Sequence, residues 1–451
     1  MGKLLLEGGE AGSLLATGWF QPGANNFLET FTTSDGVTPR KDLNGNGGSY
    51  IFGSNSPTNL EASKQLERDA REIWVRIAVS IPTFGFTSAP THFSLDDSSG
   101  ISQTNIFQPG NASFVRARRD AATLGDSAIG TVPESTDFII LSVRVYIDNA
   151  AGEVEVFKDF NFGSPLLSLT GIDTQNGSDN FARFLRVQAD DSYYDDLSAT
   201  DATVVFDTTA DTLLVGATIT GNNSGTTAIV TAIVSGSGAG QGVAQVHFVR
   251  VNGTDAWNDP SIDPWATDTV LSDGVLWTAN VLAPRTTFKD DNSGPASDGL
   301  IFALLPTTDV AGKIQLTRAG IDTGSNAGQV AAIPADDVTA LQSGVQTNIP
   351  GQRDVYELQD TTAVGFGGGD IVAVTSVMVS SFWQRDGAGL NNGNILVEDS
   401  GVEYDGPDYS LSVSGDGDGR LLNAVPDATV HGTTWSEAKV NSLRVGIKLK
   451  G

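Results

Sequence analysis

The chain has 451 residues, no cysteine and a formal net charge of −28. The lack of cysteine excludes disulfides and thiolate metal sites. The negative charge argues against nucleic acid as a partner, because surfaces that bind nucleic acid are basic. No apolar run approaches the roughly 20 residues of a membrane-spanning helix, so we expect no membrane insertion. The length predicts two or three domains.

The first regular pattern along the chain lies between residues 60 and 81. Residues 60–71 are rich in charge and are consistent with a helix or with a charged loop. From Ile73 to Ile81 every second residue is Ile or Val, and the residues between them are Trp74, Arg76, Ala78 and Ser80. This alternation predicts a half-buried strand that ends at Pro82.

A hairpin is predicted over residues 139–156. Apolar residues occupy alternate positions from Ile139 to Ile147, and Val154 and Val156 alternate with Glu153 and Glu155. The residues between the two runs, 148–152, end in glycine. Two alternating runs joined by a glycine-containing turn are typical of antiparallel strands.

Residues 203–275 have a different character. Three β-branched runs, at 213–221, 226–234 and 243–251, are separated by glycine-rich turns. This pattern predicts a compact β-meander. Alternating strands flank it on both sides, so we interpret it as an insertion.

Three elements are predicted near the C-terminus. Residues 374–379 have the composition of a strand. Residues 434–437, Thr-Trp-Ser-Glu, match the capping box that begins a helix, so a short helix is expected to follow. From Val445 to Leu449 apolar residues alternate with residues that include Lys448, as expected of a solvated or edge strand.

Together these elements predict an all-β fold. Many short strands joined by Gly, Asp and Asn turns favour β-sandwiches over other β architectures. We expect a jelly-roll sandwich to start in residues 1–202 and the inserted module to occupy 203–275. Residues 276–451 either complete the first sandwich or form a second one.

One turn resembles the first half of a calcium-binding loop. Asp42, Asn44 and Asn46 place side-chain oxygens at alternate positions, and Gly47 is at the sixth, as in an EF-hand. The twelfth position holds Gly53 instead of the bidentate glutamate. We therefore favour an ordinary Asn/Gly turn, and calcium is the only cofactor that the sequence suggests.

An aromatic and acidic cluster is the candidate glycan-binding site. Rings that stack on sugar C–H groups beside carboxylates that accept hydroxyl protons are a common way to bind glycans. The residues are Trp257, Trp265, Trp277, Asp255, Asp259 and Asp263. The alternative is that the rings pack the module against the sandwich, because aromatic side chains mostly serve burial.

No motif in the sequence predicts catalysis. The three histidines, His92, His247 and His431, are far apart in sequence and have no partner at helical spacing. Neither a phosphate-binding loop nor a nucleophile elbow is present. We therefore do not expect an enzyme.

Four segments resemble tailed-bacteriophage virion proteins with a concanavalin/laminin-G-like jelly roll. They are residues 72–76, residues 152–157 with 169–174, the glycine-rich run 215–227, and the closing helix and strand at 434–446. The third segment is similar to a small β-module of phage structural proteins. The resemblance implies a virion component and no catalytic residues.

We therefore expect a non-catalytic structural component of a virion, tail-associated or fibre-like. Its expected partners are copies of itself in a homotrimer, other virion proteins and host-surface glycans. The N-terminal apolar run, residues 4–6, is too short for a secretory signal, so assembly in the host cytoplasm is expected. The alternatives are a capsid decoration protein and a glycan depolymerase.

Overall fold

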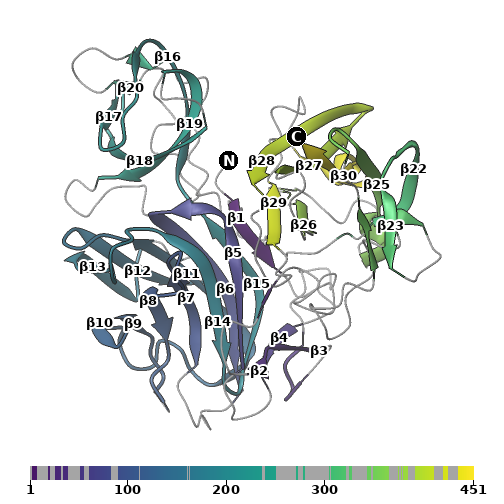
Figure 1. Ribbon diagram of the computed structural model, residues 1–451. Helices are drawn as coiled ribbons and strands as arrows, with labels where there is room; N and C mark the ends of the chain where they lie inside the picture. The colour runs from purple at the N-terminus through teal and green to yellow at the C-terminus, as the bar shows by residue number, and fades with distance from the viewer. Residues whose placement is uncertain are drawn as a thin grey trace.

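The computed structural model describes an all-β protein with one short C-terminal helix, as predicted (Figure 1). The described residues are 3–7, 19–20, 26–31, 34–38, 51–54, 60–82, 90–110, 112–159, 161, 163–235, 239–249, 271–272, 278–279, 304, 306–320, 325–327, 343–346, 349–364, 374, 377, 379–383, 392–410, 420–424 and 435–450. Within these ranges no helix is long and apolar enough to cross a membrane.

Two sheets form a sandwich from the first 200 residues. The eight-stranded sheet has the order β13 (Leu167–Ile172), β12 (Gly152–Lys158), β11 (Ser135–Tyr146), β6 (Glu72–Ile81), β15 (Ser192–Thr200), β4 (Ile51–Ser54), β3 (Glu29–Phe31), with β1 (Lys3–Glu7) also on β15. The seven-stranded sheet has the order β10 (Ala122–Asp126), β9 (Arg116–Arg119), β8 (Ser102–Phe107), β7 (Thr91–Asp96), β14 (Ala182–Ala189), β5 (Leu60–Ala70), β2 (Asn26–Phe27). The chain crosses repeatedly between the sheets, as in a jelly roll.

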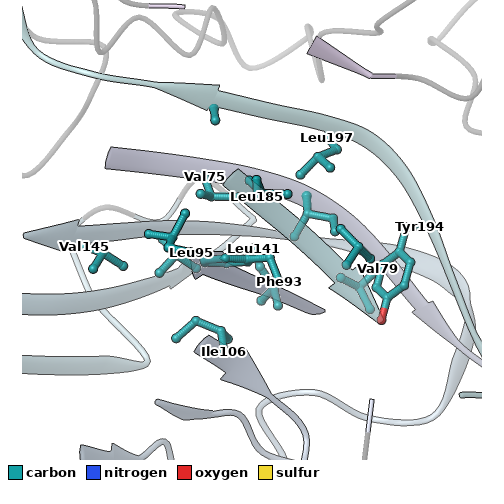
Figure 2. Close-up of a cluster of buried hydrophobic side chains, with 14 of the residues drawn as sticks. Val75, Val79, Phe93, Leu95, Ile106, Leu141, Val145, Leu185, Tyr194 and Leu197 are labelled. Carbon is teal, nitrogen blue, oxygen red and sulfur yellow. The ribbon is translucent and has the colours of Figure 1, made fainter. Parts of the chain in front are cut away.

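The core of the sandwich consists of the inward-facing residues of both sheets. Figure 2 shows Val75, Leu141, Phe93, Leu95 and Leu185 meeting in this layer. Side chains alternate between the faces of a strand, so the alternate residues of the seven-stranded sheet point outward. This outward face holds the candidate site.

Two expectations for residues 60–81 are wrong in detail. Residues 60–70 are the strand β5 rather than a helix or loop. Leu60, Ala62 and Leu66 enter the core, and pairing with β14 outweighs the weak local preference for a helix. The strand β6 is buried along its whole length rather than on one face.

The 139–156 hairpin is confirmed as β11 and β12, which pair from Leu141 with Lys158 to Tyr146 with Glu153. The outward-facing Glu155 of β12 is buried, as is Arg144 of β11. The outward face of the eight-stranded sheet is therefore covered here, where alternation alone indicates a solvated face.

A separate six-stranded sheet follows the sandwich. Its order is β16 (Thr203–Thr212), β19 (Ala239–Phe248), β18 (Thr227–Ser235), β17 (Thr218–Gly221), β20 (Leu271–Ser272), β21 (Thr278–Ala279). The sheet lies above one end of the sandwich in Figure 1. Its apolar residues, such as Ile219, Val230 and Val246, share a cluster with Trp74 and Phe157 of the sandwich.

The C-terminal strands form a further sheet beside the sandwich (Figure 1). Its order is β22 (Pro306–Ile314), β25 (Arg353–Leu358), β30 (Arg444–Lys450), β27 (Asn392–Asp399), β28 (Val402–Ser410). Two pairs stand apart: β23 (Thr317–Gly320) with β24 (Ser343–Gln346), and β26 (Val379–Trp383) with β29 (Arg420–Ala424). Among the described strands, none after residue 276 joins either sandwich sheet. The domain limits at 202 and 275 stay a prediction.

The C-terminal elements differ from their predicted forms in three ways. The strand expected at 374–379 starts at Val379. The helix α2 covers Glu437–Asn441. Its N-cap is Ser436, not Thr434 at the start of the predicted capping box, and Ser436 accepts a hydrogen bond from the backbone N–H of Lys439. The strand β30 lies between β25 and β27 and is not an edge. Its lysines, Lys448 and Lys450, pair with Asp405.

Candidate functional site

The outward face of the seven-stranded sheet carries a row of polar side chains. Leu185 of β14, Ile106 of β8 and Ala117 of β9 point into the core, so the residues next to them in sequence point outward. Strand register then aligns one outward residue from each of six strands. The row runs Ser63, Arg186, Ser94, Asn105, Arg118, Thr123.

Two further rows flank the first. One runs Gln65, Phe184, Asp96, Ser102. The other runs Glu61, Gln188, Thr91, Phe107, Arg116, Asp126. The face is therefore polar and charged, with a few aromatic rings.

Arg186 is held in place at the centre of this face. Its Nε lies 3.2 Å from Oδ2 of Asp96, and the hydroxyl of Ser94 donates a 2.6 Å hydrogen bond to Oδ1 of the same carboxylate. Burial, helped by the negative charges of Asp97 and Glu61, raises the pKa of Asp96 against the opposing effect of Arg186. The Arg186 side chain is 29% exposed and that of Asp96 only 4%. The buried acid thus orients an accessible guanidinium.

Aromatic rings lie at both sides of the polar row. Phe20 bridges to Ser63 through its backbone, and its ring meets that of Phe184 edge to face at 5.8 Å. Phe20 is 40% exposed. On the other side, Phe107 lies beneath the guanidinium of Arg118, 4.7 Å from ring centroid to Cζ.

The arginines of β9 differ in whether a carboxylate neutralises them. Arg116 binds Asp126 through two hydrogen bonds, of 2.5 and 2.7 Å, and Arg119 pairs with Asp173. Arg118 makes no ion pair with any described residue, and its buried Nε has no hydrogen-bond partner. Its positive charge is therefore unneutralised at close range.

The neighbour of Arg118 across the strand pair is also available for binding. Asn105 donates only two long hydrogen bonds, of 3.4 Å to the Ser102 hydroxyl and 3.5 Å to the Asp120 carbonyl. Its carbonyl oxygen accepts no hydrogen bond among the described residues. Thr123, on the other side of Arg118, is exposed. All three side chains can donate hydrogen bonds to one ligand, and Asn105 and Thr123 can also accept them from its hydroxyl groups.

A second charged cluster lies where the six-stranded sheet meets the sandwich. Arg144 contacts Glu72 at 2.7 Å, Glu153 at 2.6 Å and Glu155 at 3.2 Å. His247 of β19 hydrogen-bonds to Glu72 and stacks on a sandwich tyrosine, Tyr146, with centroids 3.6 Å apart.

The charges of this second cluster compensate one another. Burial by itself raises the pKa of Glu72, but the electrostatic attraction and hydrogen bonds of Arg144 and His247 outweigh burial and bring the pKa to about 2. The same acids raise the pKa of Arg144 despite its burial. The Arg144 side chain is fully buried, so this cluster holds two sheets together and is closed to a large ligand.

The residues predicted from sequence as binding sites lie outside the described residues. This holds for the aromatic and acidic cluster Trp257, Trp265, Trp277, Asp255, Asp259 and Asp263, and for the calcium-type turn Asp42, Asn44 and Asn46. Across the parts of the chain that are described, no group of three or more His, Cys, Asp or Glu side chains is arranged to hold a metal ion. His92 and His247 are both buried.

Sequence reasoning missed the polar row because its six members come from positions between residues 63 and 186. The alternation of β14, in which Leu185 and Val187 are buried and Arg186 is not, is a local signal for one member. Nothing local indicates that Arg186, Asn105 and Arg118 align. Their alignment depends on the pairing order of the sheet.

Comparison with known proteins gives no family. No family model matches the chain, and no curated protein matches it. Among solved structures, it is similar to a cellulose-induced protein, Cip1, at 15% identity and a TM-score of 0.31, covering 43% of this chain and 96% of that one.

Two other solved structures are of similar distance. A tetrameric galectin from the ball sponge Cinachyrella sp. shares 11% identity at a TM-score of 0.22, covering 31% of this chain and 99% of that one. A family 7 polysaccharide lyase, the alginate lyase AlgAT5, shares 10% identity at a TM-score of 0.23, covering 35% and 77%. Likeness at this level assigns no function to the chain.

Proposed function

We propose that this protein is a non-catalytic structural component of a phage virion, tail-associated or fibre-like, that contacts host glycans. The outward face of the seven-stranded sheet is the contact surface. The virion role rests on the resemblance of four sequence segments given above. The glycan contact rests on the polar row, and above all on Arg118, which forms no ion pair with a described residue, and on Asn105, which makes only two long hydrogen bonds.

The chemistry of the face suits a saccharide. Sugar hydroxyls need donors and acceptors spaced along a surface, and the row supplies Asn105, Arg118 and Thr123 on three adjacent strands. Arg186 lies two strands away from Asn105, and the two serines of the row, Ser63 and Ser94, are buried. Neighbouring strands are about 4.8 Å apart, close to the length of one sugar ring. Phe20 and Phe184 add an apolar margin for the C–H face of a sugar ring. A rigid sheet presents these groups with little ordering cost.

A direct binding measurement tests the glycan contact. Purified protein is titrated with fragments of host surface polysaccharide, and binding is followed by calorimetry. Asn105→Ala should weaken binding without changing the melting temperature, because Asn105 makes only long hydrogen bonds. Ser400→Ala, at an exposed turn of the C-terminal sheet, is the control and should leave binding unchanged. Equal affinities for wild type and Asn105→Ala would contradict the proposal.

The depolymerase alternative is examined with the same reagents. A buried carboxyl with a raised pKa, such as Asp96, is the kind of group that serves as a general acid. A second carboxyl about 5–9.5 Å away would be needed for glycosidase chemistry. In our proposal Asp96 orients Arg186 and no new reducing ends form on incubation with polysaccharide. If the wild-type protein produced new reducing ends and the Asp96→Asn variant did not, the protein would be a depolymerase instead.

The place on the particle is a separate question. Gold-labelled antibody on intact particles should mark the tail. Labelling of the head would favour the capsid decoration protein, and no labelling would remove the virion role altogether.

A further inference from the structure

Arg118 is an unneutralised cation on the face of an acidic protein. The chain carries a formal charge of −28, and three arginines close to Arg118 in sequence or in the rows are each paired with an acid: Arg116, Arg119 and Arg186. The nearest acid in sequence, Asp120, lies at the hairpin turn in a left-handed conformation, with φ 48°. In the described part of the chain, Asp120 forms no ion pair with Arg118.

The guanidinium is also preorganised. The Phe107 ring lies 4.7 Å below it, and a guanidinium stacked on an aromatic face keeps its edges free for planar, bidentate hydrogen bonding to an acidic group. Its Nε is buried without a partner. A ligand does not reach this buried atom, so the bidentate hydrogen bonds to an acidic group come from the two terminal guanidinium nitrogens.

We infer that the glycan bound by this face is acidic, and that Arg118 binds its carboxylate or sulfate group. The inference rests on the glycan contact proposed above and adds the class of ligand. Asn105 and Thr123, on the two strands next to Arg118, hydrogen-bond the hydroxyls of the same sugar. Arg116 and Arg186 carry charges that their acids already balance, so they contribute less to discrimination between acidic and neutral sugars.

The general field of the protein opposes a polyanion. A net negative protein repels an acidic polysaccharide at low salt, so the local attraction at Arg118 must exceed this repulsion. Sulfate and carboxylate share the acceptor geometry that a guanidinium recognises. The two sources are therefore distinguished by separate ligands.

The experiment measures the affinity of the full chain for four probes. They are oligogalacturonate (carboxylate), sulfated dextran oligomers, neutral dextran oligomers and a single-stranded oligonucleotide. Arg118→Ala is compared with Arg119→Ala, which removes the same charge one residue away on the opposite side of the strand. Thermal melting checks that both variants are folded.

The expected result is binding of at least one acidic saccharide, weakened about ten- to a hundredfold by Arg118→Ala, as for loss of a hydrogen bond between charged groups. Arg119→Ala should change the affinity less than about threefold, because Arg119 points away from this face and its charge is already paired with Asp173. Arg118→Lys should restore only part of the affinity, because lysine keeps the charge and loses the bidentate geometry.

Three outcomes overturn the inference, and they are distinguishable. If neutral and acidic dextrans bind equally and Arg118→Ala has no effect, the proposed glycan contact is retained but the inference that the glycan is acidic is wrong. If no saccharide binds, both the glycan contact and the acidic ligand are contradicted. Oligonucleotide binding that is as tight and equally dependent on Arg118 identifies a general polyanion site instead of a saccharide site.

Discussion

At the scale of single residues, His92 links the stability of the sandwich to pH. It is fully buried, its ring lies edge-on to Tyr194 at 6.1 Å, and neither ring nitrogen makes a hydrogen bond of good geometry. Burial lowers the pKa of His92 from 6.5 to about 4, and the nearby Gln108 side chain opposes this only in part. The ring is therefore neutral in the folded state at neutral pH.

The sign of the effect follows from proton binding. Between pH 6.5 and about 4 the unfolded chain binds a proton at His92 and the folded chain does not, so the free energy of unfolding falls as the pH falls. The loss attributable to this residue reaches about 3 kcal/mol. We expect His92→Gln to remove this part of the pH dependence in denaturant titrations at pH 4, 5, 6 and 7. A variant with the same slope as wild type would show that the ring is charged or exposed when folded.

At the scale of elements, the six-stranded sheet is docked on the sandwich rather than tethered to it. Trp74 and Phe157 of the sandwich stack at 5.8 Å with an interplanar angle of 17°, and they belong to the same apolar cluster as Leu213, Ile219 and Phe248. The His247–Glu72 contact adds a buried polar link. This docking buries Trp74 on the outward face of β6, which alternation does not predict.

We expect deletion of residues 203–275 to leave the sandwich folded but prone to aggregation. The deletion exposes Trp74 and Phe157, because the apolar residues packed on them are removed, and a newly exposed apolar patch promotes association. Substituting both residues by threonine in the deletion variant should restore a soluble monomer or oligomer. Circular dichroism, thermal melting and light scattering measure these effects. Absence of a cooperative melt in the substituted variant would show that the sandwich needs the deleted segment to fold.

At the scale of the whole molecule, we predict a homotrimer. The sandwich leaves edge strands on one flank, since β10 and β13 end the two sheets in the described structure, and β10 is mostly exposed. Exposed edges are templates for pairing with another chain, and closed symmetry is the usual result in assemblies. Light scattering coupled to size exclusion should give three times the chain mass of 47.1 kDa. A monomer at high concentration would contradict the prediction.

Some of this fold could be predicted from the sequence alone. Alternation with period two identifies β6, β11 and β12, because each must place apolar side chains on one face whatever its partners are. The all-β class follows from the same pattern and from the scarcity of helix signals. The absence of cysteine and the charge of −28 likewise hold without any structure, since they are sums over residues.

Other features were decided only by tertiary structure. The strand β5 forms because β14 is available to pair with it, although its charged sequence favours no strand locally. The outward-facing Trp74 of β6 is buried because another sheet packs on it. The alignment of Arg186, Asn105 and Arg118 exists only through the order β14–β7–β8–β9. Strand pairing joins residues that are distant in sequence. Backbone hydrogen bonds are alike for nearly all residue types, so the local sequence does not determine which side chains they bring side by side.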